Sequence, residues 1–232
     1  MSDRPTDELP DWEKLLAAER HLQQLVPGTV LVGGSAAAIH LLHRVSLDGD
    51  HTLADLRDRF DAVLADLEAA SGWTTERLVR PVLVLGRLDG VMTGVRQLKR
   101  SRPLDTEIVG GLRVPTLAEM ARIKAWLLVT RNTTRDFLDT VVLLERLGEN
   151  GAAEALASLD EIYSQPNGAS PLVELAERLE AGRPGDLGEI DLRTYKGLVA
   201  PWNDWTHVHA RGKAWATVVS RSTLGRSDGA AP

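Results

Sequence analysis

A short apolar run that ends in two glycines is the feature that most limits how this chain can fold. Residues Thr29 to Val32 are β-branched or apolar, which indicates a buried strand, and Gly33-Gly34 breaks that run. We expect a helix over residues 35–43 to follow at once, with Ser35 as its N-cap. A strand, a glycine turn and a helix in this order predict an α/β arrangement in the N-terminal part of the chain.

The rest of the hydrophobic pattern predicts a mixed first half and a helical second half. Residues 45–50 can form a second strand, and Asp89-Gly90 and Gly110-Gly111 predict two hairpin turns. Apolar spacing predicts further helices over residues 12–26, 52–70, 115–130, 133–147, 151–163, 170–181 and 204–219. We therefore expect an α+β fold with a mixed sheet and flanking helices. The expected parts are an α/β core over residues 1–114, a helical domain over 115–220 and a disordered tail over 221–232.

Composition excludes several classes of protein. The chain has 232 residues, 43% of them hydrophobic, and a net charge of −6, which argues against extended non-specific nucleic-acid binding but leaves a local basic patch open. The absence of cysteine excludes disulfides, thiolate metal sites and a cysteine nucleophile. No stretch approaches the ~20 apolar residues of a membrane span, and no apolar signal core begins the chain. We expect a cytoplasmic protein with no membrane partner.

The glycine turn and two nearby aspartates form the first candidate site. Gly33 and Gly34 let the backbone approach an anion, the helix N-terminus attracts negative charge, and the Ser35 hydroxyl can add a donor. Asp48 and Asp50 share one face of the expected strand, where a divalent cation such as Mg²⁺ would relieve their mutual repulsion. The alternative is a tight strand-to-helix turn followed by a solvated Asp-Gly-Asp turn.

These residues resemble the nucleotidyltransferase superfamily. The matching residues are Val32-Gly33-Gly34-Ser35-Ala36, His43-Arg44 and Ser46-Leu47-Asp48-Gly49-Asp50. The pattern looks most like the AbiEii branch, the toxins of AbiE-type toxin–antitoxin systems and their relatives. The resemblance implies that Asp48 and Asp50 bind magnesium and that Arg44 and Ser46 support the nucleotide site. Arg44 could equally form a structural ion pair, and Ser46 a structural hydrogen bond.

A second candidate site lies in the helical half and also resembles the AbiEii branch. Lys124 stands on one expected helix, and the motif Arg131, Arg135, Asp136 and Asp139 follows it. The resemblance implies that Lys124 reaches nucleotide phosphates, that the arginines belong to the nucleotide site, and that Asp136 or Asp139 orients a cation or acts as a base. The alternative is a helix-start aspartate beside an ordinary pair of Arg135 with Asp139.

The sequence departs from the superfamily pattern at one place. Many nucleotidyltransferases carry a third carboxylate on the strand beside the Asp-x-Asp strand, and the expected equivalent, residues 91–98, has no acid. Two smaller features stay open. The basic run of Arg96, Lys99, Arg100 and Arg102 is either an RNA contact or a solvated loop, and His207 and His209 lack a third metal ligand and predict a surface strand or turn.

The resemblance predicts an Mg²⁺-dependent nucleotidyltransferase that transfers NMP from an NTP to a hydroxyl acceptor. The expected acceptor is tRNA or another RNA, and the expected setting is a toxin with a cognate antitoxin partner. Three alternatives remain. The first is a catalytically degenerate nucleotide- or partner-binding module of the same fold. The second is a nucleotidyltransferase that modifies a small molecule, and the third is a protein without a nucleotide site.

Overall fold

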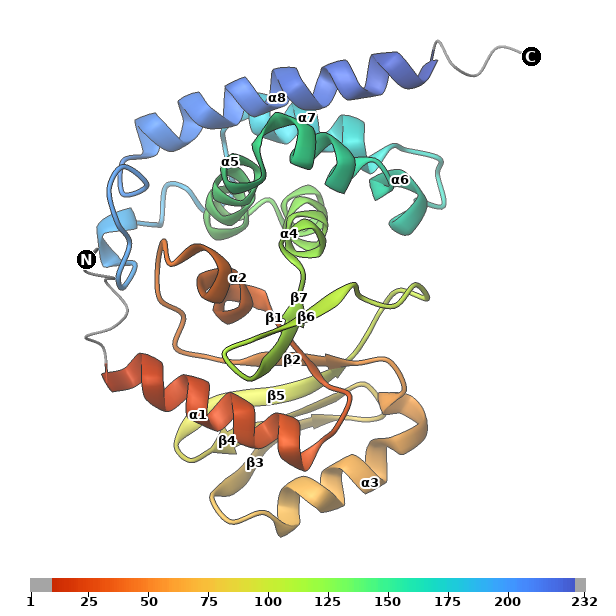
Figure 1. Cartoon of the computed structure of the whole chain (residues 1–232), viewed down its shortest axis with the longest axis vertical. Helices are drawn as coiled ribbons and strands as arrows, with labels where there is room; N and C mark the ends of the chain where they lie inside the picture. The colour runs from red at the N-terminus through yellow and green to blue at the C-terminus, as the bar shows by residue number, and fades with distance from the viewer. Residues whose placement is uncertain (1–9, 228–232) are drawn as a thin grey trace. The chain divides into compact units, whose positions relative to one another are not determined.

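The computed structural model describes residues 10–227, and the chain divides into two compact units, Met1–Thr116 and Leu117–Pro232. The first unit contains a five-stranded mixed sheet and a separate hairpin (Figure 1). The strand order is β1 (Val30–Val32), β2 (Asp50–Leu53), β5 (Val91–Gln97), β4 (Leu83–Leu88) and β3 (Trp73–Val79). Strands β2 and β5 run parallel and the other neighbours are antiparallel, which confirms the α+β class with a mixed sheet.

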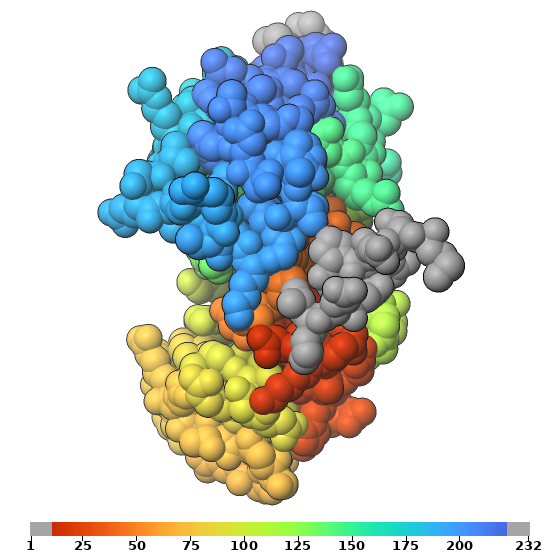
Figure 2. All heavy atoms as spheres, turned by 90° about the vertical axis from the view of Figure 1, so that its left-hand side faces the viewer, coloured from red at the N-terminus to blue at the C-terminus, as the bar shows by residue number. Residues whose placement is uncertain are grey.

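Three helices complete the first unit: α1 (Pro10–Leu25), α2 (Gly33–Leu41) and α3 (Leu56–Ala69). Apolar side chains of α1, α3, β4 and β5 form one buried cluster, so α1 and α3 cover the same face of the sheet. A second cluster joins α1 to α2 and to Val91 at the start of β5. Figure 2 shows the outer surface of α1 in red and of the segment with α3 and β3 in gold.

Both predicted hairpin turns are confirmed. Asp89 and Gly90 join β4 to β5 with φ of 53° and 81°, and Gly110 and Gly111 join β6 (Thr106–Val109) to β7 (Leu112–Pro115) with φ of 57° and 80°. Positive φ at both central residues belongs to the turn type whose twist matches that of the paired strands. The Asp-Gly and Gly-Gly pairs therefore fix the register of these strands.

Three expected elements of this unit differ from the observed ones. The strand predicted over residues 45–50 is wrong, because the ladder begins at Asp50 and Asp48 makes one isolated bridge to Met92. The helix predicted from residue 52 begins at Leu56, because Thr52 and Leu53 belong to β2. Strand β3 was not predicted, since most of its side chains are exposed and show little hydrophobic alternation.

The second unit is helical, as expected. Its helices are α4 (Leu117–Arg131), α5 (Thr134–Leu156), α6 (Leu159–Ile162), α7 (Pro171–Ala181) and α8 (Trp205–Ser227), with a 3-10 turn at Leu192–Thr194. Gly148, at φ 69°, breaks α5 into the two segments that the sequence indicated. Helix α8 continues to Ser227 rather than ending at residue 219, so the tail expected from residue 221 begins inside it, and residues 228–232 lie outside the described part.

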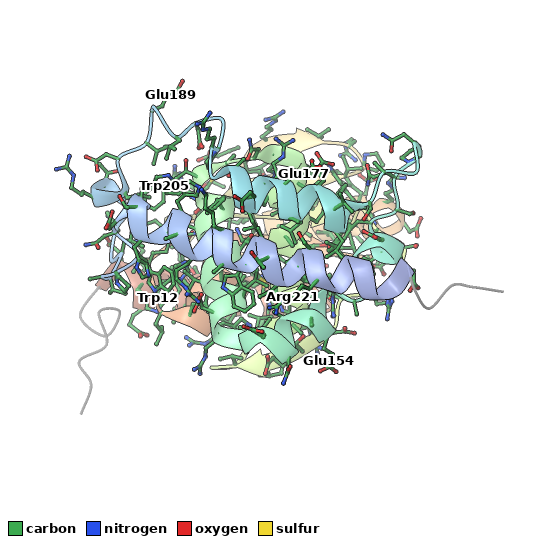
Figure 3. The ribbon with its side chains drawn as sticks, turned by 90° about the horizontal axis from the view of Figure 1, so that it is seen from above. Trp12, Glu154, Glu177, Glu189, Trp205 and Arg221 are labelled. Carbon is green, nitrogen blue, oxygen red and sulfur yellow. The ribbon has the colours of Figure 1, made fainter. Side chains whose placement is uncertain are left out.

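Tryptophans anchor α8 in this unit. Trp205, at the start of α8 in Figure 3, packs against Phe137 with ring centroids 5.1 Å apart. Trp215 is buried and donates its indole N–H to Glu145 of α5 over 2.7 Å. These contacts agree with a packing role for the tryptophans.

Within residues 10–227, no helix combines the length and the apolar character needed to cross a bilayer.

Strands β4 and β5 approach so closely at Gly94 that no side chain fits there. A Cβ at this position would lie 2.4 Å from the Val84 carbonyl oxygen and 3.0 Å from the Leu85 Cα, both backbone atoms that cannot rotate away. Gly94→Ala should lower the free energy of urea unfolding by about 1–3 kcal/mol. Gly188→Ala, where nothing lies within 4 Å, is the matched control. Equal effects of the two substitutions would contradict this packing.

Candidate functional site

The glycine turn places a free helix end beside two carboxylates. Helix α2 begins at Gly33 directly after β1, and its N-cap residue Val32 makes no side-chain capping bond. Gly33 has φ 73°, and a Cβ there would lie 3.5 Å from an Asp50 carboxylate oxygen. The first N–H groups of a helix have no partner within the helix and favour an anion. The turn can therefore hold a phosphate next to Asp50.

Ser35 has a different place from the one expected. It lies inside α2 and is fully buried, so its prediction as the N-cap is wrong. Its hydroxyl donates to the main-chain oxygen of Asp48 over 2.5 Å. The helix began two residues earlier than expected because Gly33 tolerates the positive φ at the turn. Ser35 thus ties the glycine turn to the Asp48 loop.

Asp48 and Asp50 project from the same face of the sheet, and both are accessible to solvent. Asp48 is exposed and accepts a hydrogen bond from the Ser46 hydroxyl over 2.9 Å. Asp50 is half-buried and lies 3.1 Å from Nε of Arg96. Two solvent-accessible carboxylates suit Mg²⁺, which prefers oxygen ligands and retains several waters. Within the described residues no cluster of three or more acidic or histidine side chains adds further ligands.

Arg44 and Ser46 lie behind the glycine turn. Both are buried, and a Cβ on Gly34 would lie 3.0 Å from an Arg44 guanidinium nitrogen and 2.9 Å from the Ser46 hydroxyl. Gly34 is therefore required by close approach of side chains rather than by its backbone angles. The structure brings Gly33, Gly34, Ser46, Asp48 and Asp50 together, and Arg44 supports them from below the surface.

Sequence reasoning missed a buried polar cluster centred on Glu19 of α1. Glu19 is fully buried and accepts a hydrogen bond from the Thr93 hydroxyl over 2.8 Å, with Nδ1 of His51 3.3 Å away. Its carboxyl group lies directly under Gly49, where a Cβ would come within 2.1 Å of it. The signal was available, because Glu19 falls in the buried stripe of α1 formed by Trp12, Leu15, Leu22 and Val26.

Burial changes the charge of this cluster. Desolvation raises the pKa of Glu19 to about 8, against the opposing Thr93 hydrogen bond and helped by the negative charges of Asp50 and Asp48. Desolvation lowers the pKa of His51 to about 3. Both groups are therefore neutral at pH 7. Glu19 faces Gly49 rather than the two aspartates, so it is a support beneath the Asp48–Asp50 pair and not a third carboxylate of that pair.

The neighbouring strand offers no acid to the pair. Asp48 bridges to Met92, and the register of β2 on β5 pairs His51 with Val95, so Asp50 lies beside Gly94. The two residues of β5 beside the aspartates are therefore Met92 and Gly94, and neither carries a carboxylate.

The second candidate site is a buried ion cluster between α4 and α5. Lys124 is 3% exposed, and its Nζ lies 3.1 Å from Asp136 and 2.9 Å from Asp139. Thr133 caps α5 and donates its hydroxyl to Asp136 over 3.0 Å. The structure thus brings together the lysine and both aspartates that the sequence singled out.

The arginines of the second site lie apart from this cluster. Arg131 and Arg135 are exposed, and the Arg135 guanidinium lies over the ring of Tyr195 at 5.8 Å. Asp139 is fully buried against Lys124, so the alternative of an ordinary surface pair of Arg135 with Asp139 is wrong.

His40, His207 and His209 make packing and hydrogen-bond contacts within their own units. His40 meets the Pro115 carbonyl oxygen over 2.7 Å, which ties α2 to β7. His207 and His209 lie on helix α8 rather than on the expected strand or turn. The His207 ring packs edge-on against Trp202, and Nε2 of His209 is 3.3 Å from the Glu180 carbonyl oxygen.

Solved structures share this fold over almost the whole chain. JHP933 from Helicobacter pylori aligns with a TM-score of 0.56 and 14% identity, covering 99% of this chain and 97% of that one. A second H. pylori protein, assigned as a nucleotidyltransferase, aligns with a TM-score of 0.54 and 15% identity, covering 95% and 96%. The chain therefore has a nucleotidyltransferase-type fold.

Sequence comparisons reach less of the chain. No protein-family model matches it. The heme uptake protein MmpL11 of Mycobacterium tuberculosis is 33% identical over 98 residues, which are 39% of this chain and 10% of that protein. The mycolic acid-containing lipids exporter MmpL11 of Mycolicibacterium smegmatis is 35% identical over 102 residues, 43% and 10% of the two chains. This chain spans about a tenth of the length of these curated relatives.

The contact between Glu19 and Gly49 predicts coupled effects of mutation. Gly49→Ala should be destabilising, because the new methyl group would displace the buried Glu19 carboxyl from its hydrogen bond with Thr93. In a Glu19→Ala background the space is vacated, so the same change should cost about 1–3 kcal/mol less in urea unfolding. Additive effects of the two substitutions would contradict the contact.

The raised pKa of Glu19 predicts how stability depends on pH. Between pH 4.5 and about 8 the folded protein holds a proton that the unfolded chain releases, so this group's contribution is present at low pH and lost as pH rises. The stability of wild type relative to Glu19→Gln should therefore fall with a slope approaching about 1.4 kcal/mol per pH unit. His51 acts in the opposite direction at lower pH and cancels in this difference. A difference independent of pH from 5 to 8 would show that Glu19 is not protonated when folded.

Proposed function

We propose that this protein is an Mg²⁺-dependent nucleotidyltransferase that transfers NMP from an NTP to a hydroxyl acceptor. The observation that carries the proposal is the pair of accessible carboxylates, Asp48 and Asp50, directly beside the Gly33-Gly34 turn. The shared fold supports it, because one of the aligned structures is assigned to the same class of enzyme. Asp48 and Asp50 would hold Mg²⁺, which would supply charge neutralisation for the triphosphate.

The chain's own residues would position the reacting groups. The N–H groups at the start of α2 would hold phosphate oxygens, and Ser35 and Ser46 would keep the turn and Asp48 in place. The acceptor oxygen would attack the α-phosphorus, the bond to the bridging oxygen of the β-phosphate would break, and pyrophosphate would leave. The acceptor proton would pass to solvent, because the positions where a carboxylate could act as general base are occupied by Met92 and Gly94.

The second unit carries its own group of charged residues, which the resemblance assigns to nucleotide binding. Lys124 keeps its ammonium between Asp136 and Asp139, and Arg131 and Arg135 are exposed. In this proposal Asp136 and Asp139 fix the position of Lys124, and the exposed Arg131 and Arg135 are the residues of this unit that bind anionic groups. The resemblance to AbiEii proteins supports a toxin with an RNA acceptor, such as tRNA, and a cognate antitoxin as partner.

One observation favours a second candidate function. Because β5 places Met92 and Gly94 beside the aspartates, the site lacks the carboxylate that would act as a general base, worth roughly 10²–10⁴ in rate. A nucleotide-binding module without transfer activity has the same geometry. The two functions differ in whether a covalent product forms.

Label transfer separates these functions. Each α-³²P NTP is incubated with Mg²⁺ and total tRNA, using wild type, Asp48→Ala and, as a matched control, Asp66→Ala, an exposed aspartate of α3. We expect labelled RNA from wild type and the control, and a loss of at least ~10²-fold with Asp48→Ala. Mg²⁺-dependent NTP binding without label would support the binding module. Absence of both binding and label would contradict a nucleotide site.

A further inference from the structure

The face of the sheet that carries Asp48 and Asp50 also carries a row of arginines. Residues paired across neighbouring strands point to the same face, and register pairs Met92 with Arg87, Gly94 with Leu85, and Leu85 with Arg77. Asp48 is bridged to Met92, and Arg96 contacts Asp50. The aspartates on β2 and the arginines on β5, β4 and β3 therefore lie on one continuous face, opposite to the face covered by α1 and α3. We call Arg77, Arg87 and Arg96 the arginine row.

The arginine row is exposed and only weakly committed to carboxylates. The side chain of Arg96 is 52% exposed and pairs with Asp50. The side chain of Arg87 is 50% exposed and pairs with Glu76. Exposed pairs of this kind are worth ~0–1 kcal/mol, so a stronger anion can displace them. Arg77 is exposed, and among residues 10–227 no carboxylate lies within ion-pair distance of it. The row can therefore accept several phosphates.

The side chains between the arginines are apolar. Met92 and Leu85 are half-buried on this face, and Val79, at the outer strand, is 38% exposed. Separated arginines around an apolar centre suit an extended ligand that carries several phosphates, with sugars and bases between them. The basic run predicted from the sequence contributes Arg96, whereas Arg100 folds its own loop by donating to the Arg102 and Pro103 carbonyl oxygens.

Arg77 and Arg87 lie on the far side of the aspartates from the glycine turn, whereas Arg96 contacts Asp50 beside that turn. Val32, the residue before that turn, pairs with Asp50 from β1, whereas β5, β4 and β3 extend away in the other direction. Three inter-strand spacings separate β2 from β3, which is about 14 Å. A triphosphate held at the glycine turn would leave β4 and β3 uncovered, so Arg77 and Arg87 are available to a second ligand.

We propose that the arginine row is the docking surface for the acceptor, and that the acceptor is an RNA strand whose end lies at Asp48 and Asp50 while its phosphates cross β5, β4 and β3. The inference rests on the proposed nucleotidyl transfer. It names the substrate class as a polyanion rather than a small molecule. It also reconciles RNA binding with the net charge of −6, because a local row suffices where the whole surface is acidic.

RNA affinity measured without NTP tests this surface directly. Fluorescence anisotropy with labelled tRNA compares wild type with the double variant Arg77→Ala/Arg87→Ala. The matched control is Arg57→Ala/Arg113→Ala, which removes two exposed arginines that form their hydrogen bonds through the main chain. We expect the row variant to bind about tenfold more weakly, and the slope of log affinity against log salt to fall by about 1.4. The control should bind like wild type.

The outcomes are distinct from those of the proposed function. Equal affinities of the row variant and the control, or no RNA binding by wild type, would overturn the docking surface. The thermal shift caused by NTP and Mg²⁺ is measured on the same proteins and reports the nucleotide site separately. A nucleotide-dependent shift without RNA binding would overturn the RNA acceptor and leave nucleotide binding standing.

Discussion

The packing of the Glu19 carboxyl group against the backbone at Gly49 is the constraint on which the candidate site depends. Helix α1 brings a carboxyl group into the core, and a Cβ at residue 49 would lie 2.1 Å from it, so any larger residue would have to displace the Glu19 side chain. That contact fixes the middle of the Asp48-Gly49-Asp50 turn. The two flanking carboxylates then point to the opposite, accessible face. The turn is held from below by Glu19 and from the side by the Ser35 hydroxyl on the Asp48 carbonyl oxygen.

The same arrangement separates charged from neutral acids. Glu19 loses its charge because burial raises its pKa to about 8, whereas Asp48 is exposed and Asp50 half-buried. Three carboxyl groups thus lie close together without three negative charges, which leaves a doubly charged site suited to one divalent cation. In the second unit a buried lysine lies between two aspartates, and this cluster joins α4 to α5. Removing one partner of such a buried cluster is costly, so its members also stabilise the helical unit.

The sequence predicted those parts of the fold that local chemistry determines. Asp89-Gly90 and Gly110-Gly111 specify hairpin turns by themselves, and the helices of the second unit follow from apolar spacing. The grouping of Gly33 and Gly34 with Asp48 and Asp50 was inferred from phosphate and metal chemistry and from a resemblance, and the structure places Gly33 beside Asp50. Strand β3 was missed because an edge strand with exposed side chains lacks alternation. Ser35 was assigned to the wrong position because glycine at residue 33 permits an earlier helix start than an N-cap preference indicates.

Glu19 and the arginine row depend on long-range pairing that no local pattern encodes. Glu19 is 30 residues from Gly49 in sequence, and its importance follows from the packing of α1 under β2 and β5. Arg77, Arg87 and Arg96 come from three strands, and only the register of those strands puts them on the face of the aspartates.

The most direct test of the central claim is a crystal structure of the protein with Mn²⁺ and a non-hydrolysable NTP, read by the anomalous signal of manganese. The account predicts one strong peak in contact with carboxylate oxygens of both Asp48 and Asp50, at about 2.0–2.3 Å, with phosphate at the start of α2. A nucleotide bound elsewhere, or a manganese peak away from this pair, would contradict the account.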